Sequence, residues 1–182
     1  MAMLSLFAIS GSLRRDSSNT ALLQAAARLA PEGIAVTLFE GLGDLPHFNP
    51  DLDDAQPASV LDFRRRIEAT DGLIMSTPEY AHGVPGVLKN ALDWLVGSTE
   101  LSDKPVALFH ASARGTYAVA SLTETLRIMG AKLDPQTDLI VPLLGQNLSV
   151  DKIVTHEEYG VTLRDGVLRF ARAIREHKAT ER

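Results

Sequence analysis

Two kinds of apolar pattern alternate along the chain. Short continuous apolar runs, typical of strands buried on both faces of a sheet, are separated by segments in which apolar residues recur at helical spacing. The predicted strands are Leu4–Ile9, Ile34–Phe39, Gly72–Ser76, Val106–Phe109 and Leu139–Val141. This alternation predicts parallel strands that are joined by helical crossovers.

The segments between the runs predict amphipathic helices, each with one apolar stripe and one polar face. The stripes consist of Leu22, Ala26 and Leu29; Val60, Phe63 and Ile67; Leu88, Ala91, Leu92 and Leu95; Val119, Leu122, Leu126 and Met129; and Val167, Phe170, Ala171 and Ile174. Five strands in this order predict an α/β fold, a flavodoxin-like doubly wound parallel sheet with strand order 2-1-3-4-5 and helices on both faces. The length of 182 residues predicts a single domain spanning residues 1–182.

Composition and charge narrow the chemistry. The chain has no cysteine, which excludes disulfides, thiolate catalysis and iron–sulfur clusters, so any redox chemistry requires a bound cofactor. A net charge of -5 disfavours nucleic acid as a partner, because a phosphate backbone requires a basic face. No apolar run approaches the roughly 20 residues that cross a bilayer, and the first residues lack the basic region of an export signal. We expect a cytoplasmic protein that acts on small molecules.

The residues after the first predicted strand are small, hydroxyl-bearing and basic, and they lead directly into a helix. This loop contains Gly11, Ser12, Arg14, Ser17, Ser18, Asn19 and Thr20. Unpaired amides and the positive end of a helix dipole favour anions at such a place, and Arg14 adds a charged donor. The pattern predicts a phosphate cradle. The alternative is an N-cap cluster without a ligand, because Ser, Asn and Thr cap helices in any case.

A second unusual loop follows the third predicted strand, and it contains Pro78, Glu79, Tyr80, Ala81, His82 and Gly83. In the 2-1-3-4-5 order the topological switch point lies between strands 1 and 3, so both loops border one crevice. Prolines and glycines fix the backbone, which leaves the amides of residues 79–83 free to meet a planar heterocycle. A third loop, residues 111–116, ends at the same sheet edge, and we expect it to close the far end of the heterocycle. The alternative is an ordinary Ser/Gly loop between strand and helix, which is common without a ligand.

Individual side chains of the second loop have more than one interpretation. Tyr80 can lie against a ring, Glu79 can contact a nucleotide or a partner subunit, and His82 can face solvent or substrate. The alternative for the whole loop is a rigid turn that starts the next helix at Pro85, with Tyr80 as a packing residue.

Four stretches carry a family resemblance, and these are Gly11-Ser12-Leu13-Arg14, Ser18-Asn19-Thr20, Pro78-Glu79-Tyr80 and Pro85-Gly86-Val87-Leu88-Lys89-Asn90-Ala91-Leu92-Asp93-Trp94-Leu95. Together they resemble the NADPH-dependent FMN reductase family, which includes quinone, azo-dye and chromate reductases. The resemblance implies FMN and NADPH as cofactors. It implies that the FMN phosphate is bound by Ser12, Arg14, Ser18 and Asn19, and that the isoalloxazine ring is lined by Pro78, Glu79, Tyr80 and Ala81, with Ser112 in the third ring-side loop.

The chain departs from the family pattern at Ala81-His82-Gly83. Many relatives continue Pro-Glu-Tyr with Asn and place Ser two residues later. Backbone contacts survive this change, whereas side-chain contacts and substrate preference depend on it.

Polar and aromatic positions on the helix after the second loop point away from its apolar stripe. Lys89, Asn90, Asp93 and Trp94 face solvent, a neighbouring subunit or the underside of the loop. The single tryptophan favours an interface, because aromatic residues mark buried interface centres. The family resemblance likewise implies a homodimer or homotetramer.

The remaining sequence offers no competing chemistry. It contains no Ser-His-Asp, paired-carboxylate or metal-spaced cluster, and its five histidines are scattered. We therefore expect no catalytic side chain and no metal, since the cofactor supplies the reaction. The prediction is an FMN-dependent NAD(P)H oxidoreductase that passes hydride from NADPH to FMN and then to a quinone, flavin, azo or metal-oxyanion acceptor. The alternatives are a flavodoxin-like electron carrier without its own small-molecule reductase activity, and a catalytically idle module on the same fold.

Overall fold

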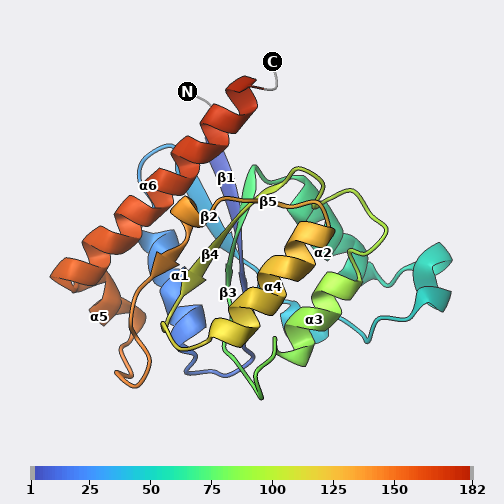
Figure 1. The fold of residues 1–182 in the computed structure, drawn as a ribbon, viewed down its shortest axis with the longest axis horizontal. Helices are drawn as coiled ribbons and strands as arrows, with labels where there is room; N and C mark the ends of the chain where they lie inside the picture. The colour runs from blue at the N-terminus through green and yellow to red at the C-terminus, as the bar shows by residue number, and fades with distance from the viewer. Residues whose placement is uncertain (1–2, 181–182) are drawn as a thin grey trace.

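The computed structural model describes residues 3–180, so the two residues at each end of the predicted span 1–182 lie outside the description. A sheet runs through the centre and helices flank it on both sides (Figure 1). The elements in chain order are β1 (Leu4–Ser10), α1 (Ser18–Leu29), β2 (Ile34–Leu38), η1 (Leu42–Asp44), η2 (Pro50–Ala55), α2 (Ala58–Glu68), β3 (Gly72–Ser76), α3 (Gly86–Asp93), β4 (Pro105–His110), α4 (Thr116–Ile128), β5 (Lys132–Leu133), η3 (Pro135–Thr137), β6 (Leu139–Ile140), α5 (Val150–Thr155) and α6 (Glu157–Thr180).

The sheet confirms the predicted topology. Its order is β2-β1-β3-β4-β5, and all of its strand pairs are parallel. Strand β1 lies between β2 and β3, with Ala8 opposite Leu38 on one side and Ile74 on the other. The switch point therefore falls between β1 and β3, so the loops that leave these two strands are neighbours at the carboxyl edge of the sheet.

The fifth position of the sheet differs from the prediction of a single strand at 139–141. Strand β5 pairs with the start of β4, and β6 pairs with its end. Between them η3 begins at Pro135, which has no amide hydrogen for a strand ladder. The Leu108 amide of β4 donates a hydrogen bond to the Asp138 carboxylate at 2.8 Å. The carboxylate thus replaces the backbone acceptor that this amide lacks between β5 and β6. The two-residue strand β5 contains Lys132, so it had no apolar run to predict it.

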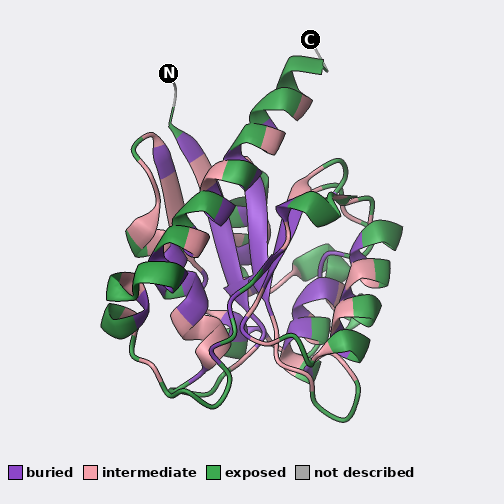
Figure 2. Ribbon diagram, turned by 60° about the vertical axis from the view of Figure 1, so that its left-hand side comes forward, coloured by how far each residue is buried: buried purple, intermediate pink, exposed green. Residues whose placement is uncertain are grey.

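Side chains of alternate residues in β1 enter two separate core layers. Leu6 and Ala8 pack in the layer that contains buried residues of α1, α5 and α6. Phe7 and Ile9 pack in the layer that contains those of α2, α3 and α4. Both faces of the sheet are therefore apolar, which explains why the strands read as continuous runs. Figure 2 shows the buried strands between helices whose outer faces are exposed.

The tryptophan of α3 lies in the core and not at a surface. The Trp94 side chain is 1% exposed, and its indole N–H donates to the Pro46 carbonyl at 2.8 Å. Asn90 donates to the same carbonyl at 2.9 Å and accepts the Phe48 amide at 2.7 Å. Asn90 and Trp94 therefore meet none of the three predicted environments, because they lie under residues 46–48 and not under the second loop. The expectation of a subunit interface at Trp94 was wrong, because the ring is used to hold this loop.

Lys89 and Asp93 form an ion pair on the partly exposed side of α3. Among residues 3–180, no helix is both long enough and apolar enough to cross a membrane.

Candidate functional site

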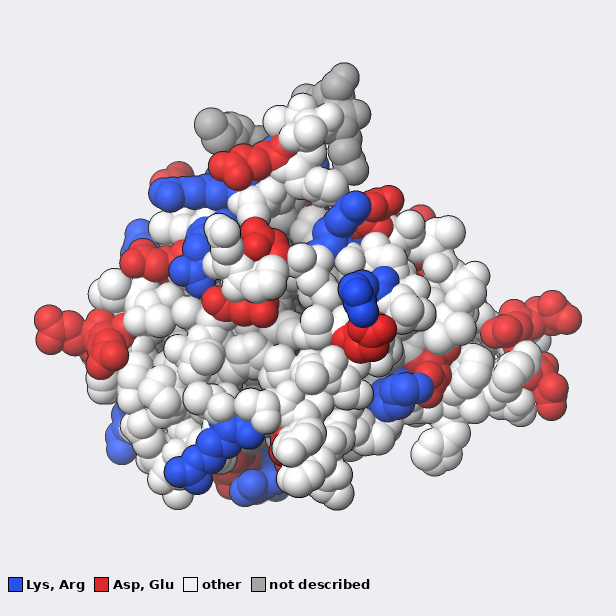
Figure 3. All heavy atoms as spheres, in the orientation of Figure 1, with Lys and Arg blue, Asp and Glu red and all other residues white. Residues whose placement is uncertain are grey.

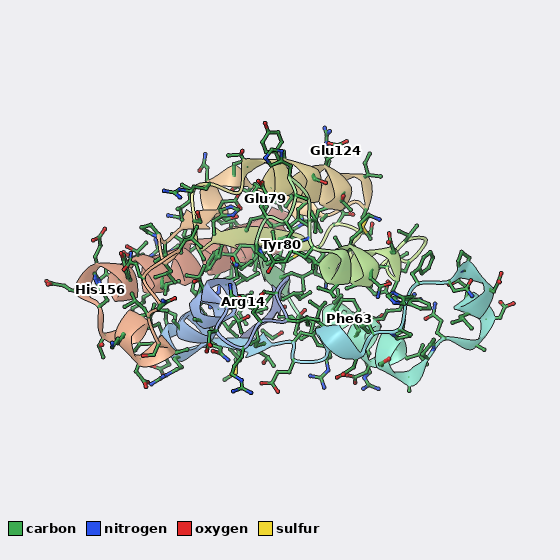
Figure 4. All side chains as sticks on the ribbon, turned by 90° about the horizontal axis from the view of Figure 1, so that it is seen from below. Arg14, Phe63, Glu79, Tyr80, Glu124 and His156 are labelled. Carbon is green, nitrogen blue, oxygen red and sulfur yellow. The ribbon has the colours of Figure 1, made fainter. Side chains whose placement is uncertain are left out.

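A pocket of about 490 Å³ opens at the carboxyl edge of the sheet, where four loops meet. The loops follow β1, β3, β4 and β6, as the pocket-lining residues show. The lining residues are Ser12, Arg14, Asp16, Ser17, Ser18, Asn19, Thr77, Pro78, Glu79, Tyr80, His110, Ala111, Ser112, Arg114, Gly115, Val119, Leu144, Gly145 and Asn147. In Figure 4, which looks onto this edge, Arg14, Glu79 and Tyr80 lie together near the middle of the view.

The first loop is built around the start of α1. Ser17 is the N-cap, and its hydroxyl accepts the Thr20 amide at 3.3 Å. The Thr20 hydroxyl in turn lies 2.7 Å from that of Ser10 at the end of β1. Thr20 is not part of the pocket wall, while Ser12, Arg14, Ser17, Ser18 and Asn19 are. The same loop is thus an N-cap cluster and one wall of the pocket, and phosphate binding by it stays a prediction.

Close packing joins the first loop to the second. The Gly11 amide donates to the Ser76 carbonyl at 2.8 Å. A β-carbon at Gly11 would lie 2.6 Å from the Thr77 hydroxyl oxygen, a separation that real β-carbons do not adopt. The Ser76 hydroxyl donates to Asn19 Oδ1 at 2.9 Å. Gly11 therefore lies outside the pocket wall and contributes by letting the two loops approach each other.

The second loop contains a two-residue hairpin at the pocket mouth. The amides and carbonyls of Tyr80 and Gly83 form a reciprocal pair of hydrogen bonds, at 3.1 and 2.9 Å. Between them Ala81 and His82 have φ angles of 48° and 60°, in the left-handed region that a type I′ turn requires. The expectation that all five amides of residues 79–83 are free was wrong, because the amides of Tyr80 and Gly83 close this turn.

The residues of this loop divide into two groups. Pro78, Glu79 and Tyr80 line the pocket. Ala81, His82 and Gly83, which the sequence placed in the site, do not. The φ angles of Ala81 and His82 turn the chain back on itself after Tyr80, and the pocket lining ends at Tyr80.

Glu79 is occupied within the same chain. Its Oε2 atom accepts the Ala118 amide hydrogen bond at 2.9 Å. Ala118 is in the first turn of α4, whose N-cap Gly115 has no side chain to provide a capping oxygen. The carboxylate therefore caps a helix from a different loop, and the negative charge is favoured at the positive end of the helix dipole. The alternatives of a nucleotide or a partner subunit were incomplete, because neither included this intrachain contact.

His82 lies over a second residue of the same helix turn. Its imidazole is stacked on the Tyr117 ring, with centroids 4.2 Å apart and an interplanar angle of 18°. Both residues are exposed. The two sequence alternatives for His82, solvent or substrate, did not include this aromatic partner.

Several pocket residues were not named as site residues in the sequence prediction, although Ala111, Arg114 and Gly115 lie in its third loop, residues 111–116. They are Asp16, Thr77, His110, Ala111, Arg114, Gly115, Val119, Leu144, Gly145 and Asn147. Arg114 follows the fourth strand, so the switch-point argument was a usable signal for it. The loop at 144–147 follows β6, the second half of the divided fifth strand. The sequence could not place this loop at the pocket, because it did not show that η3 splits the strand before it.

Two of these residues affect the pocket in different ways, His110 through its charge state and Arg114 through a backbone hydrogen bond. Burial lowers the pKa of His110, which keeps its imidazole neutral near pH 7. The Arg114 amide donates to the Ser112 hydroxyl at 3.0 Å, which shapes the third loop. Within residues 3–180, no group of three or more His, Asp or Glu side chains is arranged to hold a metal ion.

Comparison with known proteins decides the family. The model of the family described as NADPH-dependent FMN reductase matches residues 4–142. This chain belongs to that family. The resemblance drawn from the four sequence stretches is confirmed, and membership makes the chain an NAD(P)H-dependent oxidoreductase that uses FMN.

Relatives of this FMN reductase carry related descriptions. A 2-hydroxy-1,4-benzoquinone reductase of Burkholderia sp is 41% identical over 127 residues, which is 68% of each chain. A quinone reductase of Escherichia coli strain K12 is 34% identical over 130 residues, again 68% of each chain. The solved structure of FerB, a flavoenzyme NAD(P)H:(acceptor) oxidoreductase from Paracoccus denitrificans, superimposes with a TM-score of 0.84 at 31% identity. That match covers 96% of this chain and 98% of FerB.

The residues of the pocket suit FMN. Its volume of about 490 Å³ is in the range of small-molecule cofactor sites. The start of α1 offers amides without intrahelical acceptors, together with Ser12, Ser18, Asn19 and Arg14 as donors for a phosphate. Pro78 and Tyr80 on the second loop offer a rigid wall for a flat ring.

Proposed function

We propose that this FMN reductase is an NAD(P)H:quinone oxidoreductase whose cofactor occupies the pocket at the switch point. The observation that carries the proposal is the joining of two loops, one a helix N-terminus with hydroxyl and arginine donors, the other a rigid wall at Pro78–Tyr80. We also propose that residues 1–182 form one FMN-binding domain.

The phosphate end of FMN is assigned to the first loop. Ser12, Arg14, Ser18 and Asn19 line the pocket there and supply the donors. Ser17 acts as the N-cap and so fixes the first turn of α1, while Thr20 ties that turn to β1 through Ser10. An anion at this place is stabilised by free amides, by the helix dipole and by the charge of Arg14.

The ring end is assigned to the second and third loops. Pro78, Glu79 and Tyr80 form one wall and Ser112 contributes to the next. Gly11 permits the close approach of the first two loops, and Ala81, His82 and Gly83 close the hairpin that ends the wall. The neutral His110 is a further polar group on the pocket lining.

When bound, FMN supplies the redox chemistry, since it can take a hydride from NAD(P)H and pass electrons to an acceptor. The protein binds and orients the participants, and none of its side chains is assigned a proton-transfer role. The acceptor and the nicotinamide share one open pocket mouth, so we expect them to bind in turn. Overall, one NAD(P)H and one proton convert one quinone into its hydroquinone.

The names of the relatives favour a quinone over the other acceptors, because the Burkholderia sp relative is described as a benzoquinone reductase and the Escherichia coli relative as a quinone reductase. Free flavins, azo compounds and metal oxyanions remain acceptors to be compared with it. A direct test measures NADPH and NADH oxidation by the purified holoprotein with each acceptor at equal concentration. Turnover that is fastest with a quinone supports the proposal.

The main rival is a flavodoxin-like electron carrier. Flavodoxins usually have a strongly acidic surface, and their phosphate loop has no arginine, whereas this loop contains Arg14 and Arg15. On the visible face of the described chain, Figure 3 shows Lys and Arg interspersed with Asp and Glu, and acidic side chains stand at both ends of the view, one of them the protruding segment around η2. A protein that binds FMN but oxidises neither nicotinamide with any small acceptor would be the carrier, and the proposal would be withdrawn.

The assembly and location are also proposals. We infer a homodimer or homotetramer that works in the cytoplasm, where NAD(P)H is available. The family resemblance supports self-association, and exposed apolar side chains such as Val96, Ile128 and Val161 offer surfaces for it in place of Trp94. Light scattering on the purified holoprotein gives the oligomeric state, and cell fractionation gives the location.

A further inference from the structure

The hairpin at the pocket mouth is held against α4 at two points. The first is the Glu79 carboxylate on the Ala118 amide, at 2.9 Å. The second is the His82 ring stacked on the Tyr117 ring, with centroids 4.2 Å apart. Tyr80 lies between Glu79 and His82 in the chain, so the two contacts fix the backbone on both sides of it.

The hairpin needs such contacts because its backbone is unfavourable by itself. Ala81 and His82 both have positive φ angles, which L-residues other than glycine adopt with a steric penalty. A turn of this kind persists only where surrounding contacts determine it. Asn-Gly would form the same turn without help, whereas Ala-His depends on the stack with Tyr117.

Of the two tyrosine rings in this arrangement, Tyr80 belongs to the pocket lining and Tyr117 does not. Tyr80 lines the pocket and is 52% exposed, and Tyr117 is 58% exposed. Large aromatic side chains that remain this exposed around a pocket indicate a surface on which a ligand rests. Flat aromatic ligands gain from such rings through stacking beyond simple burial.

We propose that the His82–Tyr117 stack is a positioning element that fixes Tyr80 at the pocket mouth and thereby selects planar aromatic acceptors. This inference rests on the proposed quinone reductase function and adds a specificity determinant to it. His82 is a positioning residue, since its ring stacks on Tyr117 and is not part of the pocket lining.

The experiment compares two acceptors that differ in their need for a binding surface. A naphthoquinone is planar and must enter the pocket mouth, while ferricyanide is neither planar nor aromatic and takes single electrons. One NADPH reduces one quinone with uptake of a proton, or two ferricyanide ions with release of a proton. The variants are His82→Ala and Tyr117→Leu, which remove the stack, and His82→Phe, which keeps an aromatic ring without a titratable nitrogen.

The chain provides a matched control in a second histidine–tyrosine stack. The rings of His156 and Tyr159 lie 3.9 Å apart at 12°, and neither residue lines the pocket. In Figure 4 His156 lies at the side of the molecule, away from Tyr80. The variant His156→Ala removes a comparable ring contact without touching the hairpin.

In His82→Ala and Tyr117→Leu, the KM for the naphthoquinone should rise about five- to tenfold, which lies within the roughly 2- to 12-fold range that loss of an aromatic contact gives. The kcat, the rate with ferricyanide and the Kd for FMN should stay within about threefold of the parent. His82→Phe and His156→Ala should keep the parental KM. A binding measurement accompanies the kinetics: the Kd of the naphthohydroquinone for the oxidised holoprotein, followed through the flavin absorbance, should rise with the KM.

Other outcomes would overturn the inference. An unchanged KM in both variants, or a failure of His82→Phe to restore it, removes the role of the stack. A parallel loss of FMN affinity or of the ferricyanide rate shows that the hairpin supports the whole pocket. Dissociation of the oligomer in either variant assigns the rings to a subunit contact. If the parent itself oxidises no NADPH with either acceptor, the proposed function fails and not merely this inference.

Discussion

The Glu79 carboxylate accepts a hydrogen bond from the Ala118 amide, and this contact connects the loop after β3 to the first turn of α4. The two residues are 39 positions apart in the chain. Gly115 occupies the N-cap of α4 without a capping side chain, so Glu79 supplies the missing acceptor from outside the helix. The contact also joins two walls of the pocket, because Glu79 and Gly115 both line it.

Replacing Glu79 should therefore affect stability as well as the site. For Glu79→Ala we expect the free energy of unfolding to fall by about 0.5–2 kcal/mol, the usual cost of losing a helix-capping acceptor. Glu79→Gln keeps an acceptor oxygen and should lose less. Urea unfolding of the apoproteins measures both changes. Equal losses in the two variants would indicate that the charge, and not the hydrogen bond, carries the stabilisation.

Arg14 should discriminate FMN from riboflavin, because only FMN carries the phosphate. A charge-assisted hydrogen bond contributes about 1.5–3 kcal/mol, so Arg14→Ala should raise the Kd for FMN by roughly 10- to 100-fold. The Kd for riboflavin should change little. Fluorescence titration of the apoprotein gives both constants, and FAD should bind more weakly than FMN.

The adjacent Arg15 provides the control, since it does not line the pocket. Arg15→Ala should leave both constants near the parental values. If Arg14→Ala weakens riboflavin as much as FMN, then Arg14 maintains the loop and does not contact the phosphate.

The shared pocket mouth predicts the kinetic pattern. NADPH alone should bleach the flavin of the holoprotein in the absence of an acceptor. Double-reciprocal plots against NADPH at several quinone concentrations should give parallel lines, because the oxidised nicotinamide leaves before the acceptor binds. Intersecting lines would mean that both substrates occupy the pocket together.

The partly buried His110 predicts a pH dependence of stability. Burial lowers its pKa in the folded protein, while the unfolded chain has the ordinary value of about 6.5. Between these two values the unfolded state binds more protons, so the free energy of unfolding falls as the pH decreases from about 7 toward the folded pKa. Above the pKa of the unfolded state, His110 is uncharged in both states, and the full free energy of unfolding is present.

His110→Gln should flatten that slope between about pH 7.5 and pH 5, as measured by urea unfolding of the apoprotein at a series of pH values. Three carboxylates have lowered pKa values, and these are Asp62, Asp71 and Asp103. The stability that they contribute to the folded protein is lost in a more acidic range, and this loss remains in His110→Gln. A slope that persists unchanged in His110→Gln would assign the effect to another histidine.

The sequence by itself determined the strand order and the edge of the sheet at which the pocket opens. Apolar runs and helical stripes are local properties, because burial on both faces requires continuous apolar residues in a strand. They were sufficient for the order 2-1-3-4-5, and that order brought the loops at Ser12 and Pro78 to one pocket. The same reasoning placed Arg14, Asn19 and Tyr80 at this pocket, since each lies in the segment between the end of a strand and the first turn of the next helix.

Tertiary structure decided which partner each side chain meets. Trp94 donates to Pro46, Glu79 accepts from Ala118, and His82 stacks on Tyr117. These contacts join residues 35 or more positions apart. No local pattern encodes them, because they depend on how the loops and helices pack around the sheet. The division of the fifth strand into β5 and β6 also depends on tertiary packing. The Asp138 carboxylate can accept the Leu108 amide only when β4 lies beside it.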